Sequence, residues 1–238
     1  MFPRIMQILA ITTPTILLIF GAAVWLHPEW LITRLRHRSP EVLYSVDTRQ
    51  PVVALTIDDG PDREDTQKIL RVLEEYDAHA TFFIISDHIP GSEDLLQQMV
   101  FAGHELGNHL TADEPSIQLP IAEFEDKLQQ ADSILSGYDD MRWLRPGSGW
   151  YNDEMLDVIA AHDYQCVLGS VYPYDPQINS FWFSAYYVLW KIKPGSVIIL
   201  HDHGTRGQRT AKALEIILPA LADRGYQVVT ISELVGEK

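Results

Sequence analysis

Seven polar residues with side chains suited to hydrolysis each follow an apolar segment or a short turn of this chain. They are Asp58, Asp59, His109, Asp113, Arg145, Asp175 and His201. Carboxylates and histidines transfer protons near neutral pH and also bind divalent cations. If the apolar segments are parallel strands, the side chains that follow them meet at one edge of the sheet, where catalytic residues collect in such folds. The pattern therefore predicts one site that combines acid–base groups with a cation.

The adjacent carboxylates Asp58 and Asp59 follow the apolar run 52–57, which is bounded by Pro51 and by the turn residues Gly60 and Pro61. Such a run is typical of a strand that is buried on both faces of a parallel sheet. Neighbouring side chains on extended backbone point in different directions, so the two carboxylates can take different roles. The alternative interpretation is a polar turn in which one aspartate caps a helix.

A nitrogen-and-oxygen donor set, Asp59, His109 and Asp113, is suited to a divalent metal such as zinc. His109 and Asp113 are four residues apart, so one helical turn or a tight loop can direct both toward one ion. This spacing is common by chance. It is informative here because the two residues follow one of the expected strands, as the other candidate residues do. Three protein ligands would leave coordination positions for water and substrate.

From residue 62 onward, segments with helical periodicity alternate with short apolar segments. The segments expected to be strands are 52–57, 80–85, 104–109, 142–145, 164–168, 197–200 and 227–231, with the last long helix near 211–221. About seven strands that alternate with helices indicate an α/β architecture with a parallel sheet that is closed or nearly closed. We therefore expect a distorted (β/α) barrel.

The charge of the chain restricts the classes of partner. The net charge is -15 over 238 residues, and residues 51–238 carry 13 Lys/Arg against 30 Asp/Glu, a difference of -17. Such an acidic domain repels nucleic acid, which excludes that partner. The single cysteine, Cys166, cannot form an internal disulfide and is expected to be a buried apolar side chain.

The N-terminal region differs in composition from the rest. Residues 5–26 are 22 positions without a charge, which is long enough for a helix that crosses a bilayer. We expect residues 1–27 to be an apolar helix acting as a transmembrane anchor or a cleaved signal segment, 28–49 a juxtamembrane linker, and 50–238 the main domain. Three arginines in the linker (Arg34, Arg36, Arg38) favour a cytoplasmic domain, whereas long domains translocate regardless of such charges.

Five short motifs lie in order along the main domain. They are TIDDGP (56–61), GHELGNH (103–109), LRPG (144–147), SVYPYD (170–175) and GSVIILHD (195–202). In these motifs the chain resembles the NodB-type polysaccharide deacetylases, carbohydrate esterase family 4. The resemblance covers about residues 50–235 and implies the fold of the NodB homology domain.

The resemblance implies a role for each motif residue. Asp58 corresponds to the catalytic base and Arg145 to the arginine that pairs with it, while His201 corresponds to the catalytic acid. Asp175 is a candidate for orienting that histidine. Asp59 and His109 correspond to metal ligands. Asp113 stands where the family has a second histidine ligand, so we read it as a substituted ligand.

Two motifs depart from the family pattern. Pro146 is followed by Gly-Ser-Gly-Trp in place of Pro-Tyr, and Pro176 follows Asp175 in place of tryptophan. These changes remove aromatic contacts to a sugar. We expect Trp150, Tyr172 and Tyr174 to supply substrate contacts instead.

The function expected from these observations is metal-dependent hydrolysis of N-acetyl groups from an amino-sugar glycan such as peptidoglycan or chitin. A monomer outside the cytoplasm, anchored in the membrane or secreted, would meet such a substrate. Two alternatives stay open at this point. One is a hydrolase of small amides that depends little on metal, and the other is a membrane-tethered glycan-binding pseudoenzyme.

Overall fold

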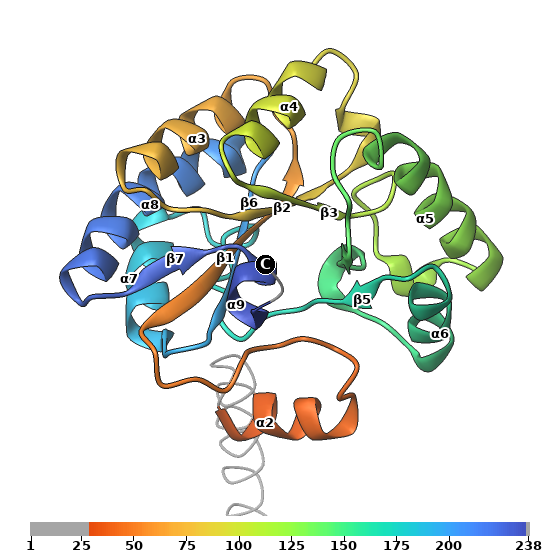
Figure 1. The fold of residues 1–238 in the computed structure, drawn as a ribbon, viewed down its shortest axis with the longest axis horizontal. Helices are drawn as coiled ribbons and strands as arrows, with labels where there is room; N and C mark the ends of the chain where they lie inside the picture. Colours follow the sequence, from red (N-terminus) through yellow and green to blue (C-terminus); the bar gives the residue numbers. More distant parts are fainter. Residues whose placement is uncertain (1–28, 237–238) are drawn as a thin grey trace, which may run out of the picture. The chain divides into compact units, whose positions relative to one another are not determined.

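The computed structural model describes residues 29–236, which divide into two units (Figure 1). The first unit ends at Pro40, and its described part contains helix α2 (Glu29–Arg38), which has Arg36, His37 and Arg38 in its last turn. The apolar helix predicted within residues 1–27 lies outside the described residues. Between residues 29 and 236, no helix is both long and apolar enough to span a bilayer.

The second unit, from Glu41 onward, is built on a sheet of seven parallel strands. The strands are β1 (Val52–Gly60), β2 (Thr81–Ile84), β3 (Glu105–Asn108), β4 (Trp143–Leu144), β5 (Gln165–Cys166), β6 (Val197–His201) and β7 (Gln227–Val229). Their order is β5-β4-β3-β2-β1-β6, and β7 pairs with the first residues of β1. The predicted seven-stranded parallel α/β sheet is therefore confirmed, and each strand lies within or close to the expected segment.

Backbone hydrogen bonds also connect the two outer strands of this order. The chain that leaves β5 runs to β6, where the N–H groups of Ser170 and Val171 donate to the carbonyl of Val197 at 3.0 and 3.1 Å. The N–H of Ile199 in turn donates to the carbonyl of Val171 at 2.9 Å. These bonds join β6 to the segment after β5, as expected for a distorted barrel.

Helices surround the strands in Figure 1. They are α3 (Asp65–Glu75), α4 (Glu93–Phe101), α5 (Ile121–Leu135), α6 (Asp153–Ala161), α7 (Phe181–Lys191), α8 (Thr205–Asp223) and α9 (Ile231–Val235), with short 3₁₀ turns at Ser86–His88, Ser116–Gln118 and Gly147–Gly149. Helix α8 begins six residues before the predicted segment 211–221. Helix α9 was not expected from the sequence, although Thr230 and Glu233 form a capping box at its start.

Side chains of β1 alternate between two apolar layers because successive residues of a strand face opposite sides. Val53, Leu55 and Ile57 pack into the larger core together with buried residues of the surrounding helices. Ala54 faces the other way, into a smaller cluster inside the sheet. That inner cluster consists of Ala54, Phe83, Trp143, Val167, Val197 and, from α9, Ile231 and Leu234.

Residues just before β1, which we expected in the linker, belong to the second unit. Val42 and Tyr44 are almost fully buried. The N–H of Leu43 donates to the carbonyl of Cys166 at 2.9 Å, and that of Val46 donates to the carbonyl of Gly195 at 2.9 Å. The compact unit therefore begins at about residue 41 and not at residue 50.

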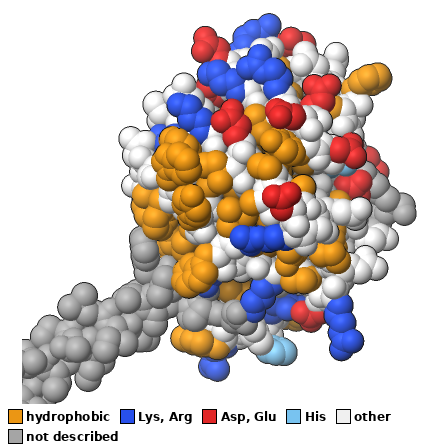
Figure 2. Space-filling view, turned by 90° about the vertical axis from the view of Figure 1, so that its left-hand side faces the viewer, with side chains coloured by type: hydrophobic (Ala, Val, Ile, Leu, Met, Phe, Trp, Pro, Cys, Tyr) orange, Lys and Arg blue, Asp and Glu red, His pale blue; other side chains and the backbone are white. Residues whose placement is uncertain are grey.

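One helix of the second unit exposes a row of aromatic side chains. Trp182, Tyr186 and Trp190 are four residues apart on α7 and more than half exposed, while Tyr187 and Val188 of the same helix are buried. Figure 2 is turned toward the side on which α7 and α8 lie in Figure 1, and it shows hydrophobic side chains gathered on this face. Helix α7 therefore contributes to the core with one side only.

Gly107 of β3 allows the ring of Phe83 to lie against the strand, so we expect Gly107→Ala to destabilise the fold. A Cβ atom at this position would lie 2.7 Å from two atoms of that ring and 3.3 Å from the carbonyl oxygen of Trp143. We expect the free energy of unfolding, measured by urea denaturation, to fall by about 1–3 kcal/mol.

Gly137→Ala is the matched control, because its Cβ would have only one neighbour, the carbonyl oxygen of Ile134 at 3.4 Å. Its free energy of unfolding should change by less than about 0.5 kcal/mol. Equal effects of the two substitutions would contradict the close packing at Gly107.

Candidate functional site

A β-bulge separates the two adjacent carboxylates of β1. Asp58 pairs with Phe83 and Gly60 with Ile84, so Asp59 is an extra residue without a partner on β2. Its φ angle is 72°, which is uncommon for a residue other than glycine. A bulge of this kind redirects a side chain that the regular alternation of the strand would place elsewhere. The two neighbouring carboxylates thus belong to different environments, as predicted.

Asp58 forms an ion pair with Arg145 inside the sheet. Nη1 of Arg145 donates to Oδ1 of Asp58 at 2.5 Å and to the hydroxyl of Thr56 at 2.8 Å. The carbonyls of Val167 and Leu168 accept from Nε and Nη2 at 3.1 and 3.0 Å. Both charged side chains are at most 5% exposed. The guanidinium is therefore held by several acceptors, and it keeps the carboxylate of Asp58 in one orientation.

Asp175 holds the ring of His201 from one side. Nδ1 of His201 lies 3.0 and 3.1 Å from the two carboxylate oxygens of Asp175, and the backbone N–H of His201 donates to the same carboxylate at 3.0 Å. Burial by itself lowers the pKa of His201. The charge and hydrogen bond of Asp175, with the charges of Asp58 and Asp59, outweigh burial and raise this pKa to about 9. His201 is therefore protonated at neutral pH and can donate a proton.

His109 and Asp59 face each other at the edge of the sheet that also carries Asp58 and His201. Nδ1 of His109 donates to the carbonyl of Arg145 at 2.6 Å, which directs Nε2 toward Oδ1 of Asp59 at 3.4 Å. A carbonyl partner on the far ring nitrogen is usual for a metal-binding histidine. Burial lowers the pKa of His109, but its contact with Asp59 outweighs burial and raises it. Two of the three predicted metal ligands therefore converge.

The third predicted ligand, Asp113, does not join them. Its side chain is 53% exposed, and its Oδ2 accepts from Nη2 of Arg206 at 3.1 Å. Nη1 of the same guanidinium lies 2.8 Å from Oδ2 of Asp59. Among residues 29–236, no group of three His, Cys, Asp or Glu side chains is arranged to hold a metal ion. The predicted donor set therefore does not fit a metal in this arrangement.

Arg206 was not identified from the sequence, because the last long helix was expected only near residues 211–221. In the structure Arg206 lies in the first turn of α8. Burial by itself raises the pKa of Asp59, but His109, His201 and Arg206 outweigh burial and hold this pKa well below its usual range. The only sign of the role of Arg206 in the sequence was that a basic residue follows shortly after His201.

Asp202 is a second residue that the sequence analysis left without a role. Its side chain is fully buried and accepts from the hydroxyl of Thr66 and from the backbone N–H of His203. Burial raises the pKa of this carboxyl to about 7, although the two hydrogen bonds oppose the shift. Its own N–H donates to the carbonyl of Asp58 at 2.7 Å. Asp202 thus joins the ends of β1 and β6, the strands that carry Asp58 and His201.

Two further histidines lie near this edge of the sheet, one against Asp59 and one against the first. Nδ1 of His88 is 2.8 Å from the backbone carbonyl of Asp59, and the rings of His88 and His203 are stacked with centroids 4.0 Å apart. Both were hard to place because they follow different strands and neither lies in a recognisable spacing with the other.

The three predicted substrate contacts differ in their surroundings. Tyr172 lies edge-on to the ring of His201, with centroids 5.8 Å apart, and to Tyr174, with centroids 5.0 Å apart. Tyr174 also contacts Tyr187 of α7. Trp150 follows a 3₁₀ turn and is 67% exposed. Tyr172 is therefore next to the proposed proton donor, and the role of Trp150 stays a prediction.

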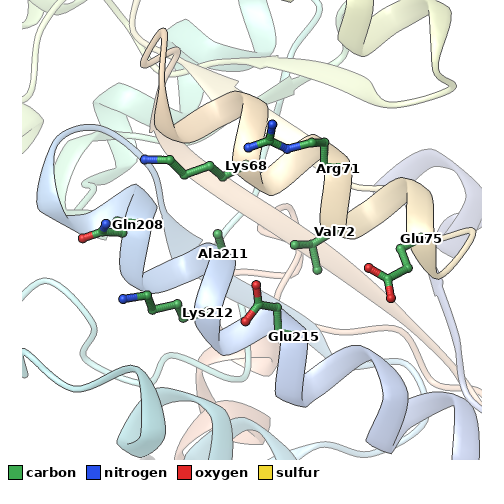
Figure 3. A pocket seen from close by; sticks show the side chains of 8 residues that line it. All are labelled: Lys68, Arg71, Val72, Glu75, Gln208, Ala211, Lys212 and Glu215. Atoms are coloured by element: carbon green, nitrogen blue, oxygen red, sulfur yellow. The ribbon is translucent and has the colours of Figure 1, made fainter.

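A groove of about 310 Å³ lies between α3 and α8 and contains none of the predicted site residues (Figure 3). It is lined by Lys68, Arg71, Val72, Glu75, Gln208, Ala211, Lys212 and Glu215. Its polar residues carry charges of both signs, as is usual on the exposed sides of two packed helices. The strand ends, and not this groove, therefore form the candidate site.

Comparisons with known proteins show which family and fold this chain shares. A sequence profile described as polysaccharide deacetylase matches residues 45–167. A peptidoglycan-N-acetylglucosamine deacetylase from Bacillus cereus is 34% identical over 83% of this chain and 94% of its own length.

Solved structures with the same fold include active and inactive relatives. The Bc1960 peptidoglycan N-acetylglucosamine deacetylase is 28% identical, with a TM-score of 0.77 over 82% of this chain and 92% of that one. BA3943 from Bacillus anthracis, a CE4 family pseudoenzyme, is 26% identical, with a TM-score of 0.74 over 82% and 68%. A family 4 acetyl xylan esterase from Clostridium thermocellum, in complex with a cobalt ion, is 28% identical, with a TM-score of 0.72 over 78% and 91%.

The contact between Asp175 and His201 predicts the titration of this histidine. We expect an NMR titration to give His201 a pKa of about 9 in the native protein. In Asp175→Asn the carboxylate charge is lost while burial remains, so this pKa should fall by about one to three pH units. At pH 8, where the native protein keeps the imidazolium, at least about half of the variant molecules should then carry neutral His201.

Asp94→Asn is the matched control, since it removes a carboxylate that is half exposed and pairs with Arg63. It should leave the titration of His201 unchanged. An unaltered pKa of His201 in Asp175→Asn would contradict the role of Asp175.

Proposed function

The chain belongs to the polysaccharide deacetylase family, and from this premise we propose that it hydrolyses N-acetyl groups of an amino-sugar glycan with Asp58 and His201 as its proton-transfer pair. The family assignment also makes it a hydrolase of non-peptide amide bonds. The observation that carries the proposal is that each member of the pair has its own buried partner, Arg145 for Asp58 and Asp175 for His201.

Asp58 has the properties of a general base. The guanidinium of Arg145 stabilises the ionised carboxylate, and its contact with one carboxylate oxygen, Oδ1, fixes the orientation of the group. In the proposed reaction the carboxylate takes a proton from water as the water oxygen bonds to the acetyl carbon. General bases within hydrogen-bond reach of a nucleophile typically contribute about 10²–10⁴-fold to the rate.

His201 has the properties of a general acid. Its Nδ1 is occupied by Asp175, so Nε2 is the ring nitrogen left to act on substrate. When the bond between the acetyl carbon and nitrogen breaks, the imidazolium gives its proton to the leaving amine. Acetate and a free amino sugar are the products, and the proton held by Asp58 returns to solvent or to His201.

A divalent metal, predicted as zinc, would supply Lewis-acid activation of the acetyl carbonyl in this family of reactions. Asp59 and His109 would contribute to such a site. Because Asp113 is paired with Arg206, no step of the reaction is assigned to a metal here. Peptidoglycan and chitin-type oligosaccharides stay the proposed substrates, and Tyr172 is the proposed contact beside His201.

A glycan-binding pseudoenzyme is the second candidate, and the position of Arg206 is the observation that favours it. BA3943 demonstrates that this fold occurs in a pseudoenzyme. Against this candidate, the base, the acid and both of their partners are present and in contact in this chain. We therefore place the hydrolase first.

The test is release of acetate from N-acetylated chitooligosaccharides and from peptidoglycan by the full chain. We expect Asp58→Asn and His201→Gln each to lower kcat by about 10²–10⁴-fold, because each removes one proton transfer. Asp94→Asn should keep the rate of the native protein. Binding of either glycan without acetate release would establish the pseudoenzyme, and turnover of small amides alone would establish the small-amide hydrolase.

We also propose that the domain acts outside the cytoplasm, because its proposed substrates are wall and surface glycans. The uncharged residues 5–26 support export, either as an anchor or as a cleaved signal. A membrane contact through this segment belongs to the same proposal.

A reporter enzyme that is active only outside the cytoplasm, fused after Lys238, should be active when the full chain is expressed. The same fusion without residues 1–27 is the control and should be inactive. Activity of a reporter that works only in the cytoplasm would contradict this location and, with it, a wall glycan as substrate.

A further inference from the structure

Arg206 connects two carboxylates that come from different parts of the fold. Asp59 lies at the bulge of β1, and Asp113 lies in the loop that follows β3. The two guanidinium nitrogens Nη1 and Nη2 reach them at 2.8 and 3.1 Å. Asp59 is buried and Asp113 is about half exposed, so the guanidinium extends from the interior of the site to its rim.

The position of Arg206 in α8 is unfavourable for a positive charge on its own. It lies in the first turn of a 19-residue helix, where the helix dipole favours anions. In this first turn the helix has no acidic residue. The two carboxylates therefore stabilise the guanidinium where it is, and they are themselves neutralised by it.

The negative charge of Asp113 accounts for a side-chain cation beside Asp59. The motif that this chain resembles has a histidine there, which is neutral when it binds a metal. A carboxylate adds a full negative charge beside Asp59, and Arg206 is the cation that contacts both. An arginine side chain is effectively always protonated in proteins, so the guanidinium stays charged.

Asp59 keeps unused capacity for a cation. Its Oδ2 is buried and lies close to Arg206, yet the two groups are not aligned as a hydrogen bond, and this oxygen has no hydrogen-bond partner among residues 29–236. Its Oδ1 lies 3.4 Å from Nε2 of His109, a separation at which both atoms could be ligands of one cation. A divalent ion and the guanidinium therefore compete for the same carboxylate.

We propose that Arg206 is the resident cation of the pair formed by Asp59 and Asp113, and that a divalent metal ion binds this chain only by displacing its guanidinium. The inference rests on the proposed function only for the location of the site. It assigns Arg206 the control of metal affinity at the strand ends. Removing the guanidinium leaves Asp59, His109 and Asp113 free to converge on one ion.

The experiment is calorimetric titration of the full chain with Zn²⁺ and with Co²⁺, in the absence of glycan. If the guanidinium leaves the site in about one native molecule in ten, the native metal affinity is lowered about tenfold. We therefore expect Arg206→Gln to bind each metal about tenfold or more tightly than the native protein. Arg206→Lys should fall between the two, since it keeps the charge but cannot contact both carboxylates at once.

Two further variants separate this effect from net charge and from misfolding. Arg224→Gln removes the same charge at the far end of α8, where Nη1 donates to the carbonyl of Leu189, and it should bind metal like the native protein. The double variant Arg206→Gln/Asp113→Asn should lose the gain in affinity if Asp113 is the ligand that Arg206 releases. Circular dichroism of each variant verifies the fold.

Equal metal affinities of Arg206→Gln and the native protein would overturn the proposal, and so would a gain that persists in the double variant. Because the titration contains no glycan, its result does not depend on deacetylation. If Arg206→Gln gains metal affinity but the native protein releases no acetate, the proposed substrate is wrong and the role of Arg206 stands.

Discussion

The buried ion pair between Asp58 and Arg145 is the constraint on which the rest of the site depends. A charge inside a protein is costly unless it is paired and hydrogen-bonded, and removing one member of such a pair typically costs about 3–5 kcal/mol. Here one guanidinium contacts Asp58, Thr56 and two backbone carbonyls, and it also lies 4.1 Å above the ring of Phe83. The strand ends can converge only in the arrangement that satisfies all of these partners.

Two connections extend this constraint to the remaining site residues. The backbone carbonyl of Arg145 accepts from Nδ1 of His109 and so sets the direction of that ring. The backbone carbonyl of Asp58 accepts from the N–H of Asp202, which directly follows His201. His201, Asp58 and His109 are therefore positioned through the backbone of the same ion pair. A hydrolytic site built in this way has little freedom to rearrange one member alone.

The residues around the expected cation are the part of the site that the ion pair of Asp58 and Arg145 does not hold in place. Asp58, Arg145, Asp175 and His201 are almost fully buried or held by several contacts, whereas Asp113 lies at the rim and Arg206 enters from the start of a helix. Polysaccharide deacetylases and a pseudoenzyme share this fold, so activity in the family depends on such local differences. In this chain a guanidinium contacts two of the three expected metal ligands.

The sequence by itself determined the parallel α/β sheet, the strand that carries Asp58 and Asp59, and the identities of the strand-end residues. Local patterns suffice for these features because buried strands, turns and motif residues are adjacent in the chain. Only the tertiary structure decided the bulge that separates Asp59 from Asp58, the start of α8 at Thr205 and the pairing of Asp113 with Arg206. Those features depend on contacts between residues far apart in sequence, 93 positions in the case of Asp113 and Arg206, and no local periodicity records such contacts.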